Sequence, residues 1–165
     1  MPLGLCQVGE AARSAGHEVE LHDLMFEADP QAAIDRWLRG AVDVVGLSLR
    51  NMDNCDAHAS VSFIPEARDI VAHIRKICSA PIVLGGAALG VAPRGILETV
   101  MADYAVVGDG ERTFVELLRV LEGLWWVVPG VLGRVCGLES CFWGGWCLLQ
   151  PLFLGDKQAQ KKKQG

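Results

Sequence analysis

Three short apolar runs constrain the fold of this chain more than any other feature. They read DVVGLSL at 43–49, APIVLGG at 80–86 and YAVVGDG at 104–110, and a segment with helical periodicity follows each of them. A strand that is apolar on both faces is typical of a parallel sheet covered by helices on both sides. Parallel strands also need long crossover connections, which are usually helices. The alternation therefore predicts an α/β fold.

The segments around these runs have the spacing of amphipathic helices. Pro30 stands at the start of one helix, and Gly16 and Gly40 are placed to end two of them. The expected helices lie within 3–16, 30–40, 64–78, 93–101 and 112–123, and HEVELHDL at 17–24 alternates like a further strand. Right-handed crossovers then predict a Rossmann-like, doubly wound domain with a mainly parallel sheet flanked by helices.

The chain reaches its first expected helix without a preceding strand, although a doubly wound domain normally opens with one. We expect either a sheet that lacks a strand near its centre or another segment that takes its place. WWVVPGVLGRV at 125–135 is apolar and β-branched enough to be that substitute strand.

The composition changes after Gly123. Four of the five tryptophans and three of the six cysteines lie in 124–165, which ends in a lysine-rich stretch. We therefore divide the chain into an α/β domain at 1–123 and an atypical apolar tail at 124–165. Three interpretations of the tail stay open: an appended hairpin, a patch for self-association, or sequence read from a shifted or truncated frame.

Charge and hydropathy narrow the classes of partner. A formal net charge of −5 disfavours nucleic acid, which is bound by basic surfaces. The N-terminus has no basic start followed by an apolar run, so no secretory signal is expected. The apolar tail contains Gln150 and Pro151 and is too short to cross a bilayer. These features predict a cytoplasmic protein with reduced thiols and no membrane association.

The cysteines do not have the spacing of a metal site. Three are scattered, as small core residues are: Cys6, Cys55 and Cys78. Cys136, Cys141 and Cys147 are separated by four and five residues, which matches neither the CxxC of zinc sites nor the CxxxCxxC of radical SAM clusters. No metal ligand is assigned, and a metal–thiol protein built on these three residues is the weakest functional hypothesis.

Polar or glycine-rich turns follow all three apolar runs, at Ser48–Asn51, Gly85–Gly86 and Gly108–Glu111. The carboxyl ends of parallel strands meet at one edge of a sheet, where ligands bind in open α/β folds. Glycine permits positive φ and a close backbone approach to a ligand, and a helix that starts at Glu111 favours anions nearby. Taken singly, each loop is explained equally well as an ordinary turn.

The sequence has no motif for nucleotide binding, for hydrolytic catalysis or for a histidine metal ligand. The chain has neither the GxGxxG dinucleotide fingerprint nor the GxxxxGK[ST] phosphate loop, which disfavours nicotinamide and nucleoside-triphosphate enzymes. No serine–histidine–acid order or paired carboxylates mark a catalytic site. We interpret His58, in DAHAS, as a surface or hydrogen-bonded residue rather than a metal ligand.

Five stretches in order resemble the cobalamin-binding domain that precedes the catalytic domain in cobalamin-dependent radical SAM enzymes. They are the PLGL helix, AGHEVELHDL, DVVGLSLRNMDN, PIVLGG and VVGDGE, and they cover residues 2–122. The resemblance implies a Rossmann-like domain that holds the corrin over the sheet edge, with the nucleotide tail in a slot beside the strands. The residues that it places at the cofactor are Ser48, Leu49, Arg50, Asn51, Gly85, Gly86, Ala87, Gly108, Asp109, Gly110 and Glu111.

The chain departs from this family in two respects. The first strand is absent, together with the DxHxxG loop whose histidine ligates cobalt in one branch of relatives. DAHASV at 56–61 has Val61 where that motif needs glycine and follows a different strand, so no ligand role is transferred to His58. The CxxxCxxC cluster motif is also absent, so the chain is not expected to perform radical SAM chemistry on its own.

Two functional hypotheses of different classes follow. The first is a cobalamin-binding module without catalysis of its own, whose partner is a radical SAM catalytic domain or protein. The second is a degenerate structural or interaction domain, or a truncated fragment, that has kept the fold and no longer binds the cofactor. The rim loops favour the first hypothesis, and the missing strand and the atypical tail favour the second.

Overall fold

The computed structural model describes residues 3–123 and 131–133 of the chain, and its elements alternate as the sequence predicts. Helices and strands follow in the order α1 (Leu3–Ser14), α2 (Pro30–Trp37), β1 (Val45–Ser48), α3 (Ile64–Ile77), β2 (Ile82–Gly85), α4 (Pro93–Val100), β3 (Tyr104–Val106), α5 (Gly110–Leu121) and β4 (Val131–Gly133). Two short 3-10 helices, η1 (Leu24–Phe26) and η2 (Ala87–Gly90), lie in the connections. The predicted α/β class is confirmed.

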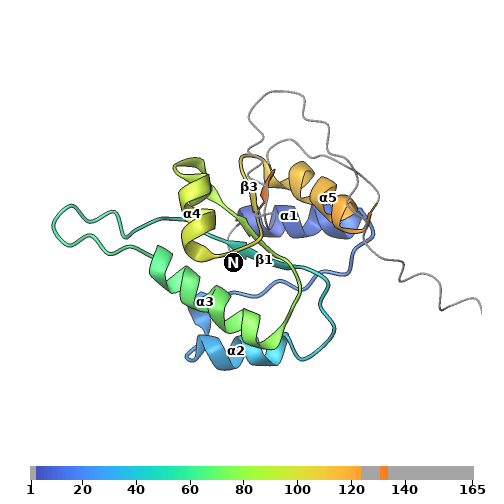
Figure 1. The fold of residues 1–165 in the computed structure, drawn as a ribbon, viewed down its shortest axis with the longest axis horizontal. Coiled ribbons are helices and arrows are strands. Elements are labelled where there is room, and N and C mark those ends of the chain that lie inside the picture. The colour runs from blue at the N-terminus through green and yellow to red at the C-terminus, as the bar shows by residue number, and fades with distance from the viewer. Residues whose placement is uncertain (1–2, 124–130, 134–165) are drawn as a thin grey trace, which may run out of the picture.

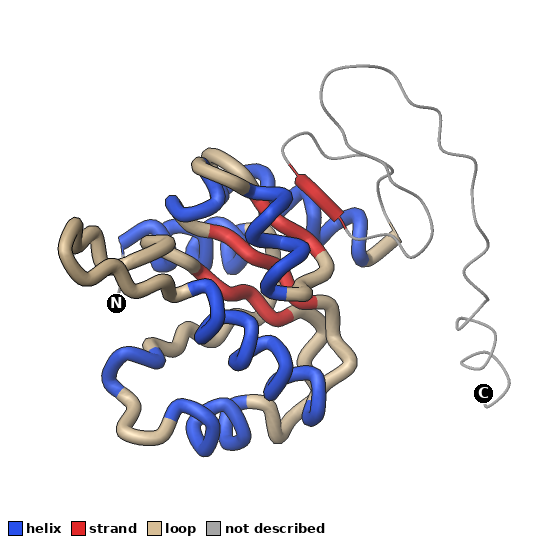
Figure 2. The backbone as a smooth tube through the Cα atoms, turned by 60° about the vertical axis from the view of Figure 1, so that its left-hand side comes forward, coloured by secondary structure: helices blue, strands red, loops and turns tan. Residues whose placement is uncertain are grey.

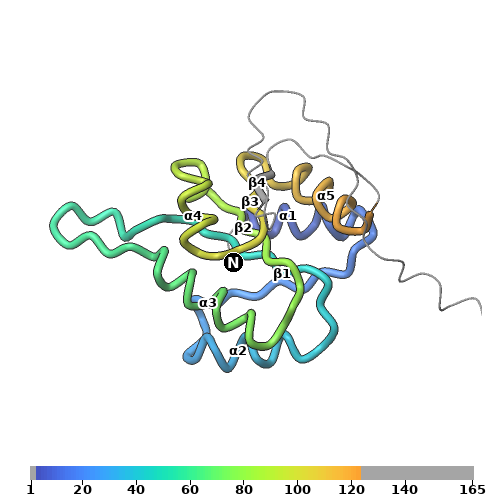
Figure 3. The backbone as a smooth tube through the Cα atoms, viewed as in Figure 1, coloured from blue at the N-terminus to red at the C-terminus, as the bar shows by residue number. Residues whose placement is uncertain are grey.

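The strands form one sheet in the order β1-β2-β3-β4 (Figure 3). The first three are parallel, and β4 is antiparallel to β3. Helices α3 and α4 pack together, as do α1 and α5, and the two pairs lie on opposite sides of the sheet (Figure 1). This is the helix-flanked, Rossmann-like arrangement that the alternation predicts.

Alternate residues of the strands build a core on each side of the sheet. Ile82 and Leu84 are fully buried and contribute to a large cluster that also contains Val71 and Ile74 of α3. Val83, Val106 and Leu117 form a smaller cluster on the other side. Each large aliphatic side chain buried in this way stabilises the fold by about 1.5–3 kcal/mol, so the interior of the sheet is held from both faces.

Two strand predictions fail because a strand depends on its neighbours. HEVELHDL, expected as a strand at 17–24, has no strand partner among the described residues, and its end forms η1. WWVVPGVLGRV does contain a strand, β4, but β4 pairs with β3. That is the edge opposite β1, so β4 is not a substitute for the missing strand beside β1.

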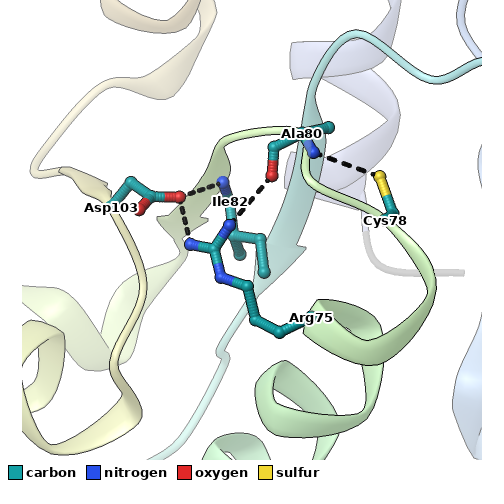
Figure 4. A network of polar contacts seen from close by, with 5 residues as sticks. All are labelled: Arg75, Cys78, Ala80, Ile82 and Asp103. Atoms are coloured by element: carbon teal, nitrogen blue, oxygen red, sulfur yellow. Dashed lines mark hydrogen bonds and ion pairs between the residues drawn. The ribbon is translucent and has the colours of Figure 1, made fainter.

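A cluster of polar contacts links the amino ends of β2 and β3 (Figure 4). The Asp103 carboxylate accepts a hydrogen bond from the Ile82 N–H (N···O 2.7 Å) and forms an ion pair with the Arg75 guanidinium. Arg75 also donates to the Ala80 carbonyl oxygen at 3.1 Å, and the Ala80 N–H donates to the Cys78 sulfur at 3.2 Å. The cluster therefore lies at the amino ends of the strands, whereas the polar and glycine-rich turns follow their carboxyl ends.

Tyr104, beside this cluster, has a raised pKa, first because burial disfavours its phenolate and second because Asp103 is negatively charged. Unfolding would return the pKa to about 10. The folded state therefore keeps its full stability below that value and loses stability as the pH rises through the folded pKa. Tyr104 is the only tyrosine of the sequence, so tyrosinate absorbance reports this group alone. We expect Tyr104 to lose its proton at a higher pH in the native chain than in the urea-unfolded chain. Coincident titration curves for the two states would contradict the effect of burial.

The described helices have no membrane-spanning candidate, since none combines sufficient length with sufficient apolar character to cross a bilayer.

Candidate functional site

The turns after β1 and β2 are joined to each other by backbone hydrogen bonds. Ser48 and Gly85 are direct neighbours in the parallel register. The Leu49 N–H donates to the Gly85 carbonyl oxygen at 2.8 Å, and the Ala88 N–H donates to the Leu49 carbonyl oxygen at 3.1 Å. Two of the three loops that the sequence assigns to a ligand rim are therefore held side by side.

Gly86 is required by this contact between the two turns. Its φ is +98°, in the region that favours glycine, and a Cβ at this position would lie 2.3 Å from the Leu49 oxygen. The sequence suggests that Gly86 provides access for a ligand. The structure assigns it a second role, in which it lets the turn after β2 approach the backbone of Leu49.

The third loop, Gly108–Glu111, joins β3 to α5. Gly108 has a φ of +88°, with open space where a Cβ would be. Gly110 begins α5, and a Cβ there would lie 2.9 Å from a methyl carbon of Val8 in α1. The double glycine thus serves two purposes: Gly108 turns the chain, and Gly110 lets α1 pack against α5.

The three loops line one hollow of about 1720 Å³, which extends along β1 from Asp43 and Pro81 at the amino ends of the strands to the turns at their carboxyl ends. Its wall contains nine of the eleven residues predicted as a site: Ser48, Arg50, Gly85, Gly86, Ala87, Gly108, Asp109, Gly110 and Glu111. Two predicted residues do not line it. Leu49 packs against the large core cluster, and Asn51 is exposed outside the hollow.

Small residues on one face of the sheet leave part of the hollow open. Gly46 has only Phe114 of α5, at 4.0 Å, near the position of a Cβ, and Gly85 has nothing within 4 Å. Ser48 lies next to Gly85 in the register and is exposed. A larger side chain at any of these positions would fill space that is otherwise open to a ligand. Gly46 was not predicted, although a glycine inside an apolar strand is a signal of close approach.

The arrangement is suited to binding a bulky molecule by shape. The wall combines apolar residues such as Val45 and Phe114 with the polar side chains of Ser48, Arg50 and Asp109 at the rim. Within 3–123 and 131–133, no group of three or more histidine, cysteine, aspartate or glutamate side chains could hold a metal ion. Cys136, Cys141 and Cys147 lie outside the described residues.

The polar run after Ser48 has a mainly structural explanation. The chain from Leu49 to Phe63 projects from the body of the domain (Figure 1) and returns through a bridge between Asp53 and Ser62. The Asn54 side chain accepts from the Val61 N–H at 3.0 Å and donates to the Ala59 carbonyl oxygen at 2.9 Å. Such bonds from aspartate and asparagine to nearby backbone are typical of turns.

Two residues of this projecting loop bear on the sequence predictions. Cys55 is exposed with a φ of +56°, so the expectation that it is a core residue is wrong; the core lies too far from the loop tip. His58 is exposed, and its backbone N–H donates to the Asp56 carboxylate at 2.8 Å. The interpretation of His58 as a surface residue agrees with this placement.

A family model, a relative and solved structures are all similar to this chain over most of its length. Residues 1–118 match the family model described as the B12 binding domain. A tryptophan 2-C-methyltransferase from Streptomyces laurentii is 27% identical over 122 residues, which are 73% of this chain and 20% of the relative.

Two solved structures of the radical S-adenosylmethionine methyltransferase TsrM from Kitasatospora setae share the fold at 28% identity. One contains tryptophan substrate and a SAM analogue and superimposes with a TM-score of 0.77; the other contains cobalamin and a [4Fe-4S] cluster, with a TM-score of 0.76. Each match covers 81% of this chain and 26% of the solved chain. The chain thus spans about a fifth to a quarter of the length of these relatives.

Proposed function

The chain belongs to the B12-binding domain family, with cobalamin as its cofactor, and from this premise we propose that it is the cobalamin-binding module of a radical SAM-associated system. One observation carries the proposal for the site: three loops at the carboxyl edge of the sheet, which are distant in sequence, line a single hollow. That edge is where open α/β sheets bind ligands.

The residues present fit a large, amide-rimmed macrocycle and its tail. Gly85 and Gly108 leave open space where side chains would otherwise stand, so the nucleotide tail would enter beside β2. The Ser48 hydroxyl can donate and accept hydrogen bonds, and Arg50 can donate to oxygen atoms at the ligand's edge. Leu49 would act indirectly, because its backbone holds the Ser48 and Gly86 turns together. Asn51, also proposed from the sequence, would act only at the periphery.

Cobalamin supplies the reactive cobalt when it is bound, and the protein supplies position and exclusion of water. We assign the catalytic cluster to another domain or protein, because the sequence has no CxxxCxxC motif. The two named relatives are methyltransferases, so the reaction that this module serves would be a methyl transfer. Its partner would be a radical SAM catalytic unit.

A second candidate is a structural or interaction domain that has lost the cofactor. The observation in its favour is that no strand among the described residues pairs with the outer edge of β1, where a complete doubly wound sheet would have one. The cytoplasmic location and self-association through 124–165 stay predictions from the sequence.

Cofactor retention separates the two candidates. The purified chain is mixed with hydroxocobalamin and desalted, and its visible spectrum is recorded. We expect corrin absorbance to stay with the protein at close to one equivalent. Complete separation of protein and corrin, from a chain whose circular dichroism shows the folded α/β domain, would contradict the binding module and favour the structural domain.

A further inference from the structure

Four large apolar side chains of the described residues are exposed to an unusual degree. Leu3, Met25, Phe26 and Val91 are 74%, 90%, 84% and 75% exposed, more than any other large hydrophobic side chain of that part of the chain. A single exposed hydrophobic residue is normal, whereas several around one opening indicate a contact surface. We refer to these four residues as the apolar patch.

The apolar patch borders the carboxyl end of the hollow. Leu3 lines the hollow itself, and so do Leu24 and Gly90, which directly precede Met25 and Val91 in the chain. Figure 1 and Figure 2 both show the connection before α2, which contains η1, on the same side of the domain as the projecting 49–63 loop. The patch therefore lies at the end of the hollow where the three turns meet.

The turn that presents Met25 and Phe26 is held in one conformation. The Asp23 carboxylate accepts a hydrogen bond from the Met25 N–H at 3.2 Å. Glu27, directly after Phe26, forms an ion pair with Arg36 of α2 at 2.9 Å, and Leu24 packs against the large core cluster. An apolar pair that is already fixed loses little conformational entropy when a partner covers it.

The sequence itself contains a matching occupant. Residues 141–155 read CFWGGWCLLQPLFLG, fifteen residues without a charged side chain. Such a segment is unfavourable in water unless another surface covers it. It lies outside the described residues, and the described part of the chain offers the apolar patch as a surface of the same character.

Charge favours the same pairing. Residues 3–123 contain 18 acidic and ten basic residues, a net charge of −8, whereas 124–165 contain two acidic and five basic residues, a net charge of +3. Four of those five are lysines within 157–163, directly after the apolar segment. Asp109 and Glu111 line the hollow, and no ion pair between described residues uses either carboxylate. Exposed pairs contribute only about 0.2–1 kcal/mol each, so charge would orient the segment and apolar burial would hold it.

The segment can reach the apolar patch within one chain. Strand β4 ends at Gly133, which pairs with Tyr104 at the amino end of β3. The seven residues at 134–140 span up to about 25 Å when extended. The carboxyl edge lies about 13 Å away along a strand of four residues, and β1 lies about 10 Å away across two strand spacings.

The energies are sufficient for contact within one chain. Covering Met25 and Phe26 contributes about 1.5–3 kcal/mol for each side chain. A segment tethered to its site has an effective concentration of roughly 1 mM, so it needs a binding free energy of only about 4 kcal/mol to be bound half of the time. Burial of these two side chains alone therefore comes close to populating the bound state.

We propose that residues 141–155 bind the apolar patch of the same chain, with the lysines of 157–163 beside Asp109 and Glu111. The bound segment covers the carboxyl end of the hollow and competes with a ligand that enters there. This competition rests on the proposed function, in which the ligand is cobalamin; the contact between the segment and the patch does not.

Tryptophan fluorescence tests the contact without the cofactor. Trp125 and Trp126 are replaced by phenylalanine, so that Trp143 and Trp146 report the segment over the constant background of Trp37, which is stacked on His22. We expect acrylamide to quench Trp143 and Trp146 several-fold less in the native chain than in urea, because burial excludes the quencher. Met25→Ser with Phe26→Ser should remove this protection.

The matched control changes two exposed apolar residues away from the hollow. Ile77 ends α3 and Met101 follows α4, and neither lines the hollow. Ile77→Ser with Met101→Ser should therefore keep the protection. If circular dichroism shows that the Met25 and Phe26 variant is unfolded, the reciprocal variant replaces it. This variant, Leu148→Ser with Leu149→Ser and Leu152→Ser, leaves the α/β domain unchanged and should also lose the protection.

A titration with hydroxocobalamin tests the competition. If the segment covers the site in nine of ten molecules, the apparent affinity is about tenfold below the intrinsic one. The variant with serine at 148, 149 and 152 should then bind about tenfold more tightly than the unchanged chain. Equal affinities would contradict the competition. If neither chain retains corrin, the proposed function fails, and the quenching measurement still decides whether the segment contacts the patch.

Three results would overturn the contact itself. The first is equal quenching of Trp143 and Trp146 in the native and the urea-unfolded chain. The second is protection that persists in a folded Met25 and Phe26 variant, which would place the segment on another surface. The third is protection that rises with protein concentration together with a dimer in sedimentation, which would make a second copy of the chain the occupant.

Discussion

Replacing Gly86 by alanine is expected to lower the free energy of unfolding by about 3 kcal/mol or more, among the largest effects of a single substitution. The new Cβ would lie 2.3 Å from the oxygen, 2.8 Å from the carbon and 2.9 Å from the nitrogen of the Leu49 backbone. Leu49 cannot move away cheaply, because its N–H and carbonyl oxygen bond Gly85 and Ala88. The positive φ of +98° adds backbone strain to the clash.

Alanine substitutions at two other glycines separate the cost of backbone strain at positive φ from the cost of the steric clash with Leu49. Gly108 also has a positive φ, +88°, with open space around its Cβ position, so its replacement should cost only about 1 kcal/mol. Gly85 has open space around its Cβ position and no positive φ, so its replacement should change stability by less than about 0.5 kcal/mol. Urea unfolding of the three variants measures the series. Equal losses at Gly86 and Gly108 would show that the contact with Leu49 is unimportant.

Replacing Gly85 by phenylalanine is expected to weaken cobalamin binding by about a hundredfold or more, or about 2.7 kcal/mol, while the domain stays folded. A Cβ at Gly85 meets nothing within 4 Å and stands beside Ser48 in the wall of the hollow. The ring would therefore enter the space proposed for the nucleotide tail. A bulky residue at Gly86 is a poorer test, because it would remove the fold together with the site.

The matched control introduces phenylalanine at a glycine outside the hollow. Gly95 in α4 also has open space at its Cβ position, is exposed and does not line the hollow. The Gly95→Phe variant should keep wild-type affinity in a titration with hydroxocobalamin followed by visible absorbance. Undiminished binding by a folded Gly85→Phe variant would contradict the proposed position of the tail, even if the chain binds cobalamin at another site.

Most of the element order could be predicted because it depends on neighbours along the chain. Pro30 and Pro93 stand at the first residues of α2 and α4, and Gly16, with a φ of +99°, follows the end of α1. The end of α2 was placed too late, at Gly40 rather than Trp37. Such boundaries are decided by packing, and local periodicity reports them only to within a turn.

The candidate site was predictable only as a set of three turns. Their common position followed from the geometry of parallel sheets, and nine of the eleven named residues do line one hollow. Leu49 and Asn51 do not, because side chains alternate and only the backbone of Leu49 takes part in the contact between turns. The polar residues after Ser48 proved to stabilise their own loop, since side chains such as Asn54 bond nearby backbone.

By itself, the sequence determined the kinds of element and their order, because periodicity, glycine and proline act over a few residues. The tertiary structure alone decided which of those elements became neighbours. It paired Ser48 with Gly85 and brought Gly86 against Leu49. Within the described part of the chain, it also left apolar β1 at an edge of the sheet and formed no strand from HEVELHDL. Those outcomes depend on contacts between residues far apart in the chain, for which a local pattern contains no information.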